Sequence, residues 1–82
     1  MSTETKLRRY ILENFLFTED EEALSNSDSF LDRGIVDSTG IMEVIFFVEE
    51  EFGFNVEDEE MVPENLDSID ALVAFVGRKQ AG

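Results

Sequence analysis

The stretch between Asp37 and Gly53 limits the possible folds more than any other, because it carries an uninterrupted helical pattern. Its apolar residues recur at the spacing of one helix face, i, i+3, i+4, i+7 and i+11, at Ile41, Val44, Ile45, Val48 and Phe52. We expect that face to be buried in the core and Gly53 to end the helix. The same periodicity places Phe46 almost opposite the core face, between Glu43 and Glu50. An apolar residue on the acidic side of a helix requires a separate explanation.

A first helix is expected near the N-terminus, starting at Ser2 or Thr3, either of which can cap it, and running to about Phe15. Its buried stripe is Leu7, Tyr10, Ile11 and Phe15. Its water-facing residues are Lys6, Arg8, Arg9 and Glu13. The polar, turn-rich stretches that follow predict a long loop. Four apolar residues should hold this loop against the core: Phe30, Leu31, Ile35 and Val36.

A last helix is expected after a cap at Asp67 or Ser68, and it should end at Gly77. Its buried stripe repeats the same spacing at Ile69, Leu72, Val73 and Val76. Before it, residues 57–61 should form a short helical turn stopped by Pro63. The sequence therefore predicts an all-α fold, a small bundle of three main helices plus one short helix. We expect residues 1–82 to form a single domain, with an ordered core at about residues 3–79.

The charge balance limits the classes of partner. With 20 acidic and 6 basic residues the formal net charge is −14, which argues against nucleic acid and favours a basic protein partner. Cysteine and histidine are absent, so Ser-His and Cys-His catalysis and nearly all zinc or iron sites are excluded. The N-terminus lacks the apolar stretch of a signal peptide, and apolar runs such as residues 44–48 are far too short to cross a bilayer. We expect a cytoplasmic monomer without membrane insertion.

Oxygen-bearing side chains in the long loop raise the question of a metal site. Asn26, Asp28 and Asp32 are possible ligands, but their spacing does not match the pattern of an EF-hand calcium loop. Carboxylate pairs suited to catalysis carry little information in so acidic a chain, where some pair will always lie close. We therefore expect a solvated acidic surface, with no dedicated metal site and no catalytic residues.

Ser38 stands at the start of the second helix, where a serine can simply cap the free backbone N–H groups. Helical spacing nevertheless brings it beside an apolar strip flanked by carboxylates, which would suit a basic and partly apolar groove on a partner. We call this surface the recognition strip, and its residues are Asp37, Thr39, Met42, Glu43, Phe46 and Glu50.

With these residues in place, the sequence resembles the acyl carrier protein family, which includes peptidyl and aminoacyl carriers. The family has an Asp-Ser pair at the start of a long acidic helix, matched by Asp37 and Ser38. Further matches are Phe30 in Asp-Ser-Phe, the Glu-Glu-Glu-Phe-Gly run at residues 49–53, and Leu-Asp-Ser-Ile at residues 66–69. The resemblance covers nearly the whole chain and agrees with its size, charge and order of helices.

The resemblance implies that Ser38 carries a 4′-phosphopantetheine arm, attached as a phosphodiester from coenzyme A by a phosphopantetheinyl transferase. It also implies that the chain is a non-catalytic carrier, holding an acyl or aminoacyl group as a thioester. The partners would then be acyl-transfer or adenylating enzymes with basic docking patches.

One departure from the family concerns the pathway. Where the family usually has a bulky apolar residue after the serine, commonly Leu, this chain has Thr39 and then Gly40. This favours a specialised pathway over general fatty acid biosynthesis. Residues 34–40 and 63–70 look more like free-standing aminoacyl or peptidyl carriers loaded by an adenylating ligase. An alternative of another class stays open, an acidic interaction module without a prosthetic group, in which Ser38 is only a cap.

Overall fold

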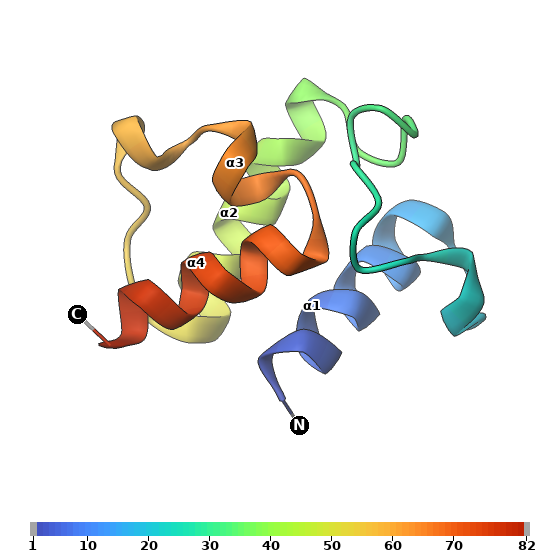
Figure 1. Ribbon diagram of the computed structural model, residues 1–82, viewed down its shortest axis with the longest axis horizontal. Helices are drawn as coiled ribbons and strands as arrows, with labels where there is room; N and C mark the ends of the chain where they lie inside the picture. Colours follow the sequence, from blue (N-terminus) through green and yellow to red (C-terminus); the bar gives the residue numbers. More distant parts are fainter. Residues whose placement is uncertain (1, 82) are drawn as a thin grey trace.

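The computed structural model describes residues 2–81, and every regular element within them is helical (Figure 1). The four α-helices are α1 (Thr3–Ile11), α2 (Ser38–Phe52), α3 (Pro63–Leu66) and α4 (Ile69–Ala81). A π-helical turn, η1 (Leu12–Leu16), continues α1, and two short 3₁₀ turns, η2 (Glu21–Ala23) and η3 (Asp58–Glu60), lie in the connections. The predicted all-α bundle of three main helices and one short helix is confirmed.

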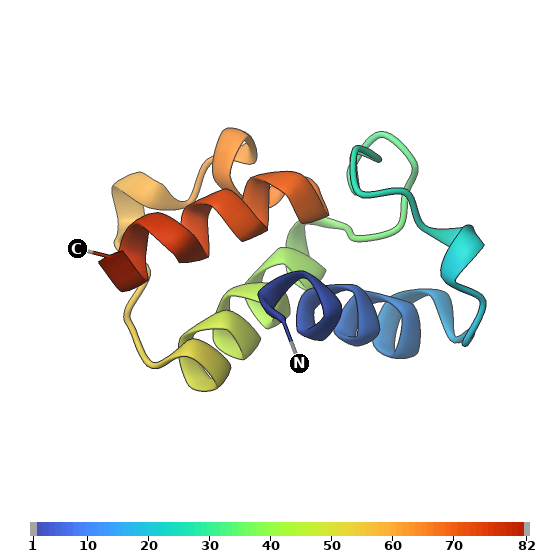
Figure 2. The same cartoon turned by 60° about the horizontal axis from the view of Figure 1, so that its bottom comes forward.

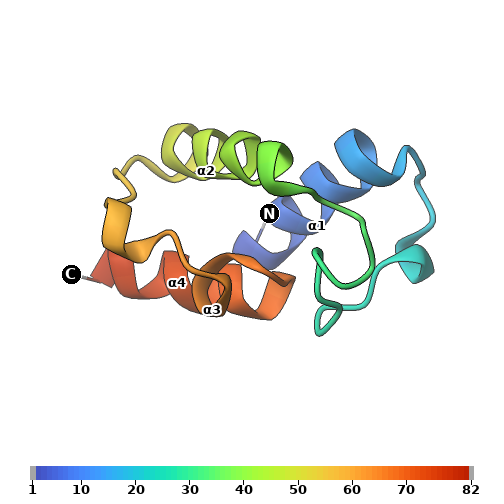
Figure 3. The same cartoon turned by 90° about the horizontal axis from the view of Figure 1, so that it is seen from above.

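The helices enclose one core. In Figure 3, α2 lies on one side and α3 with α4 on the other, while the end of α1 lies beyond the start of α2. The view in Figure 2 shows α4 above α1 and α2, with the long loop at the far end of the molecule. Fifteen apolar residues are buried: Leu7, Ile11, Leu12, Leu24, Phe30, Val36, Val44, Ile45, Val48, Val56, Leu66, Ile69, Leu72, Phe75 and Val76.

The predicted core stripes are largely confirmed, with some corrections. On α2, Val44, Ile45 and Val48 are buried, while Ile41 and Phe52 are half-buried at the edge of the core. Tyr10, Phe15, Ile35 and Val73 are also half-buried. The core residues that were missed include Leu24 and Leu66, Leu12, where the π turn changes the helical phase, and Phe75, which packs edge-on against Phe54 (centroids 5.9 Å apart). Leu31 was expected in the core and is instead 43% exposed.

Several helix boundaries differ from the expectation. The first helix continues past Phe15 to Leu16, because the chain takes on an extra residue in its π turn. Pro63 does not stop a turn but occupies the first position of α3, where its missing N–H costs nothing. The last helix does not end at Gly77 but runs to Ala81. Gly53 ends α2 in the left-handed conformation (φ 74°), as predicted.

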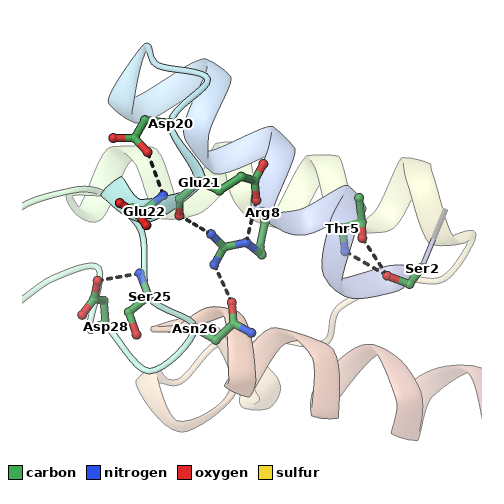
Figure 4. A network of polar contacts seen from close by, with 9 residues as sticks. All are labelled: Ser2, Thr5, Arg8, Asp20, Glu21, Glu22, Ser25, Asn26 and Asp28. Carbon is green, nitrogen blue, oxygen red and sulfur yellow. Dashed lines mark hydrogen bonds and ion pairs between the residues drawn. The ribbon is translucent and has the colours of Figure 1, made fainter.

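The long loop between η1 and α2 is held by Arg8, which had been expected to face water (Figure 4). Its guanidinium donates to Asn26 Oδ1 and to the Glu21 carbonyl, both at 2.6 Å, and it pairs with the Glu21 carboxylate at 3.3 Å. The Asn26 carbonyl in turn accepts from the backbone N–H of Asp70 at the start of α4 (3.0 Å). Arg8 thereby joins α1, the loop and α4.

Two of the three loop residues considered as metal ligands, Asn26 and Asp28, have other side-chain partners. Asn26 is bonded to Arg8, and Asp28 accepts from the Ser25 N–H (2.9 Å) and pairs with Arg33 (2.5 Å). The Ser25 hydrogen bond, with Arg33 beside it, lowers the pKa of Asp28. Within residues 2–81, no three His, Cys, Asp or Glu side chains are grouped to hold a metal ion.

Candidate functional site at the start of α2

Asp37, and not Ser38, caps α2. Asp37 has an extended backbone, and its Oδ1 accepts the N–H of Gly40 at 2.7 Å, while its carbonyl accepts the N–H of Ile41 at 2.9 Å. Ser38 is the first residue inside the helix and is exposed. Among residues 2–81, no side chain or backbone group is hydrogen-bonded to its hydroxyl. The cap expected of Ser38 is therefore supplied by its neighbour, which leaves the hydroxyl available.

Gly40 lets the start of α2 lie close to the end of the first helix. A Cβ atom at this position would be 2.9 Å from Val36 Cγ1 and 3.0 Å from Phe15 Cε1. Val36 is fully buried, so the segment leading into Asp37 is fixed on the core immediately before the helix begins. The backbone that presents Ser38 is thus braced on both sides by packing.

An apolar cavity of about 190 Å³ opens beside Ser38, between the start of α2 and α3. Its lining consists of Leu31, Ser38, Ile41, Met61, Val62, Pro63, Leu66 and Asp67. Six of these residues are apolar, Ser38 contributes a hydroxyl, and Asp67 contributes a carboxylate. A cavity of this composition suits an apolar group that starts at Ser38.

The Asp67 carboxylate is occupied by the loop that forms one wall of the cavity. It accepts the N–H of Leu31 at 3.0 Å and the hydroxyl of Ser29, and the Asp67 carbonyl accepts the N–H of Phe30 at 2.8 Å. These bonds explain why Leu31 is half-exposed, since they hold it at the mouth of the cavity and away from the core. From the sequence, Asp67 was expected only as a possible cap of the last helix, a role that Ser68 performs by accepting the N–H of Ala71 (3.0 Å).

The recognition strip lies on one exposed face of α2 and its cap. All six residues are exposed, and the apolar members, Met42 and Phe46, are 43% and 58% exposed. Glu43 also lies beside Tyr10 of α1, where burial and then this carboxylate raise the pKa of the phenol. The ring of Tyr10 stacks on Phe47 (centroids 4.0 Å apart, planes at 12°) and so joins α1 to α2. The predicted exposure of Phe46 is confirmed.

The cavity beside Ser38 was not predicted from the sequence. Its wall opposite Ser38 comes from three consecutive residues, Met61, Val62 and Pro63. The available signal in the sequence was the apolar pair Met61 and Val62 before Pro63, but helical periodicity does not predict which element such a pair faces.

No helix within the described residues is both long enough and apolar enough to span a membrane.

No protein-family model matches the chain. The fold is similar to the solution NMR structure of a holo acyl carrier protein from Nitrosomonas europaea, with a TM-score of 0.78. The two sequences are 28% identical, and the alignment covers 100% of each chain. The resemblance to the acyl carrier protein family that the sequence indicated is therefore confirmed.

Proposed function

We propose that this chain, which is similar to a holo acyl carrier protein over its full length, holds an acyl group on a 4′-phosphopantetheine arm at Ser38. The observation that carries this proposal is the exposed hydroxyl of Ser38, left without a capping role by Asp37 and placed on the rim of an apolar cavity. The group, when bound, supplies a terminal thiol that carries the acyl cargo as a thioester. A chain without cysteine needs that thiol from elsewhere.

The residues around Ser38 fit such a group. A helix N-terminus favours a phosphate because its N–H groups and its dipole attract anions. Other serine hydroxyls have structural partners. Ser2 caps α1 by accepting the Thr5 N–H (3.1 Å), Ser68 caps α4, and Ser29 donates to Asp67. Ser38 differs from these three in having an exposed hydroxyl that holds no helix or loop in place.

Attachment requires Ser38 Oγ to form a new bond to the pantetheine phosphate of coenzyme A. The bond between that phosphorus and the adenosine side of coenzyme A breaks, and adenosine 3′,5′-bisphosphate leaves. The hydroxyl proton passes to a general base that the transferase supplies. The role of this chain is to present the hydroxyl on a braced helix start.

The recognition strip supports docking to enzymes with basic surfaces. Its carboxylates belong to Asp37, Glu43 and Glu50, and its apolar side chains, Met42 and Phe46, lie among them. A partner groove with Lys or Arg at its rim would be steered by the charge of −14 and held by the apolar contacts. We propose that the phosphopantetheinyl transferase and the acyl-transfer or adenylating enzymes use this strip, with Thr39 next to the attachment point.

The cavity favours an apolar acyl group over an aminoacyl group. The carboxylate of Asp67 is the one charged group of its lining, and both oxygens already accept bonds from the loop. An ammonium group inside the cavity would therefore lose water without gaining a free anionic partner. The residue after the serine, Thr39 in place of a bulky apolar residue, supports a specialised pathway. We propose a cytoplasmic, monomeric, single carrier domain.

Incubation with coenzyme A and a broad-specificity phosphopantetheinyl transferase tests the proposal. Intact mass spectrometry should show one added phosphopantetheine on the wild type and none on Ser38→Ala. Ser27→Ala is the matched control, because Ser27 is an exposed loop serine, and it should be modified like the wild type. An unmodified wild type would refute the carrier function and favour the interaction module. A gain on Ser38→Ala would mean that another serine is the attachment point.

A further inference from the structure

Phe17, directly after the π turn, combines exposure with an unfavourable backbone conformation. Its side chain is 81% exposed, the largest exposure among the large apolar residues that the structure describes. Its φ is +53°, and within residues 2–81 no other residue except glycine has a positive φ. The core therefore does not use this ring.

The backbone does not require phenylalanine either. The N–H groups of Phe17 and Thr18 both donate to the carbonyl of Leu12, which closes the end of the helix. A residue that ends a helix in the left-handed conformation is usually glycine, because any Cβ atom is strained there. Glycine would make the same two hydrogen bonds without strain. A strained and exposed aromatic residue, next to a π turn, indicates a role on the surface.

The surroundings of Phe17 indicate the chemistry of its partner. A hollow beside it is lined by Arg9, Leu12, Glu13, Thr18, Glu19 and Glu21. The exposed carboxylates of Asp20 and Glu22 follow on the same turn (Figure 4). An apolar ring bordered by mostly negative charge complements an apolar pocket bordered by Lys or Arg. The same charge disfavours an anionic lipid surface and a second copy of this chain, whose net charge is also −14.

The segment just before Phe17 lies against the start of α2, the helix that carries Ser38. Two residues earlier, Phe15 lies against Gly40, and it lines a shallow hollow together with Asp37 and Thr39. In Figure 3 the end of the first helix lies just beyond the start of α2. An enzyme that covers the Ser38 hydroxyl from this end of the molecule therefore reaches the loop that begins at Phe17.

We propose that Phe17 is a second anchor for the enzyme that acts on Ser38, inserting its ring into an apolar pocket bordered by basic residues. This inference rests on the proposed function at Ser38 and adds a contact outside the recognition strip. The anchor acts on binding and has no part in the transfer itself, so its loss should raise KM for the carrier and leave kcat nearly unchanged.

Phe17→Gly separates this role from a structural one. Glycine relieves the strain of the positive φ, so the variant should melt at the same temperature as the wild type or higher. With coenzyme A and the transferase used above, its KM should rise about tenfold, the effect of losing a binding anchor. Phe17→Tyr keeps the ring and is the matched control, and its KM should stay near that of the wild type.

Each other outcome would overturn the inference. A wild type that is not modified removes the proposed function and the inference together, whereas a modified wild type with an unchanged KM in Phe17→Gly removes only the inference. A lower melting temperature for Phe17→Gly would show that the ring is needed for packing. Flotation with phosphatidylglycerol vesicles should show no binding of the wild type. Sedimentation velocity should show that the wild type is a monomer. Vesicle binding that is lost in Phe17→Gly would make a membrane the partner. A dimer that is lost in Phe17→Gly would make a second copy of this chain the partner.

Discussion

Replacing Gly40 by alanine tests whether close packing at the start of α2 holds the site in place. The new Cβ would be 2.9 Å from Val36 Cγ1, 3.0 Å from Phe15 Cε1 and 3.3 Å from Asp37 Oδ1. Carbon atoms normally approach no closer than about 3.5 Å, so at least one neighbour has to move. Val36 is fully buried and has little room, and Asp37 is held in place because it caps the helix by accepting the N–H of Gly40.

The expected magnitude follows from two opposing terms. Alanine gains up to about 1 kcal/mol over glycine from its helix propensity, while overpacking of this kind costs about 1–3 kcal/mol. We expect a net loss of about 1 kcal/mol for Gly40→Ala, which lowers the melting temperature by about 4–8 °C in a domain of this size.

Gly77→Ala is the matched control, because it should gain helix propensity without the cost of overpacking. Gly77 is an exposed position inside α4, and no atom lies within 4 Å of its would-be Cβ. This variant should be stabilised by about 0.5–1 kcal/mol. Thermal unfolding followed by circular dichroism at neutral pH measures both variants. If Gly40→Ala is stabilised as much as Gly77→Ala, the close approach between α2 and the end of the first helix is wrong.

Three further predictions use single side chains. Phe46→Ala should lower the free energy of unfolding by about 1 kcal/mol or less, because the ring is 58% exposed. Phe30→Ala in the core should lower it by about 3–5 kcal/mol. Equal losses of the two variants in thermal melts would contradict the helical phase of α2. The Glu57 N–H and then Lys79 lower the pKa of Glu60 below 4.5, so its charge stabilises the fold above about pH 4.5. The melting temperature difference between wild type and Glu60→Gln should therefore be largest at pH 7 and shrink as the pH falls below 4.5, and a difference that stays constant to pH 3 would refute the assignment. In an ultraviolet titration Tyr10 should ionise above pH 10, and Glu43→Gln should lower its pKa only in part because burial is the larger cause; a complete return to 10.0 would contradict that order.

The recognition strip could be predicted because it depends on the helix itself. The positions of Val44, Ile45 and Val48 set the phase of α2, and the phase then requires Phe46 to point away from the core. The end at Gly53 was also predictable, since a glycine directly after the last apolar residue of the stripe favours the left-handed conformation that ends a helix. A pattern of period 3.6 records the angular order of residues around one helix and needs no knowledge of other elements.

The ends of the other helices depended on contacts that sequence spacing does not record. The last helix continues past Gly77 because residues beyond it have distant partners, Lys79 at the Glu60 carboxylate (2.9 Å) and Arg78 at the Asn65 side chain (2.8 Å). Such bonds outweigh the low helix propensity of a glycine. The exposure of Phe17 likewise follows from a π turn, which shifts the helical phase by one residue.

The sequence by itself determined that Ser38 lies at the start of an amphipathic helix with a partly apolar, acidic outer face. Both Asp37 and Ser38 are good capping residues, so local preference did not decide which one caps the helix. The tertiary structure decided it, because burial of Val36 and the close approach at Gly40 fix where the backbone turns into α2. The cavity beside Ser38 likewise exists only in the folded chain, since its walls come from the start of α2 and from residues 61–67, which are distant in sequence and which only packing brings together.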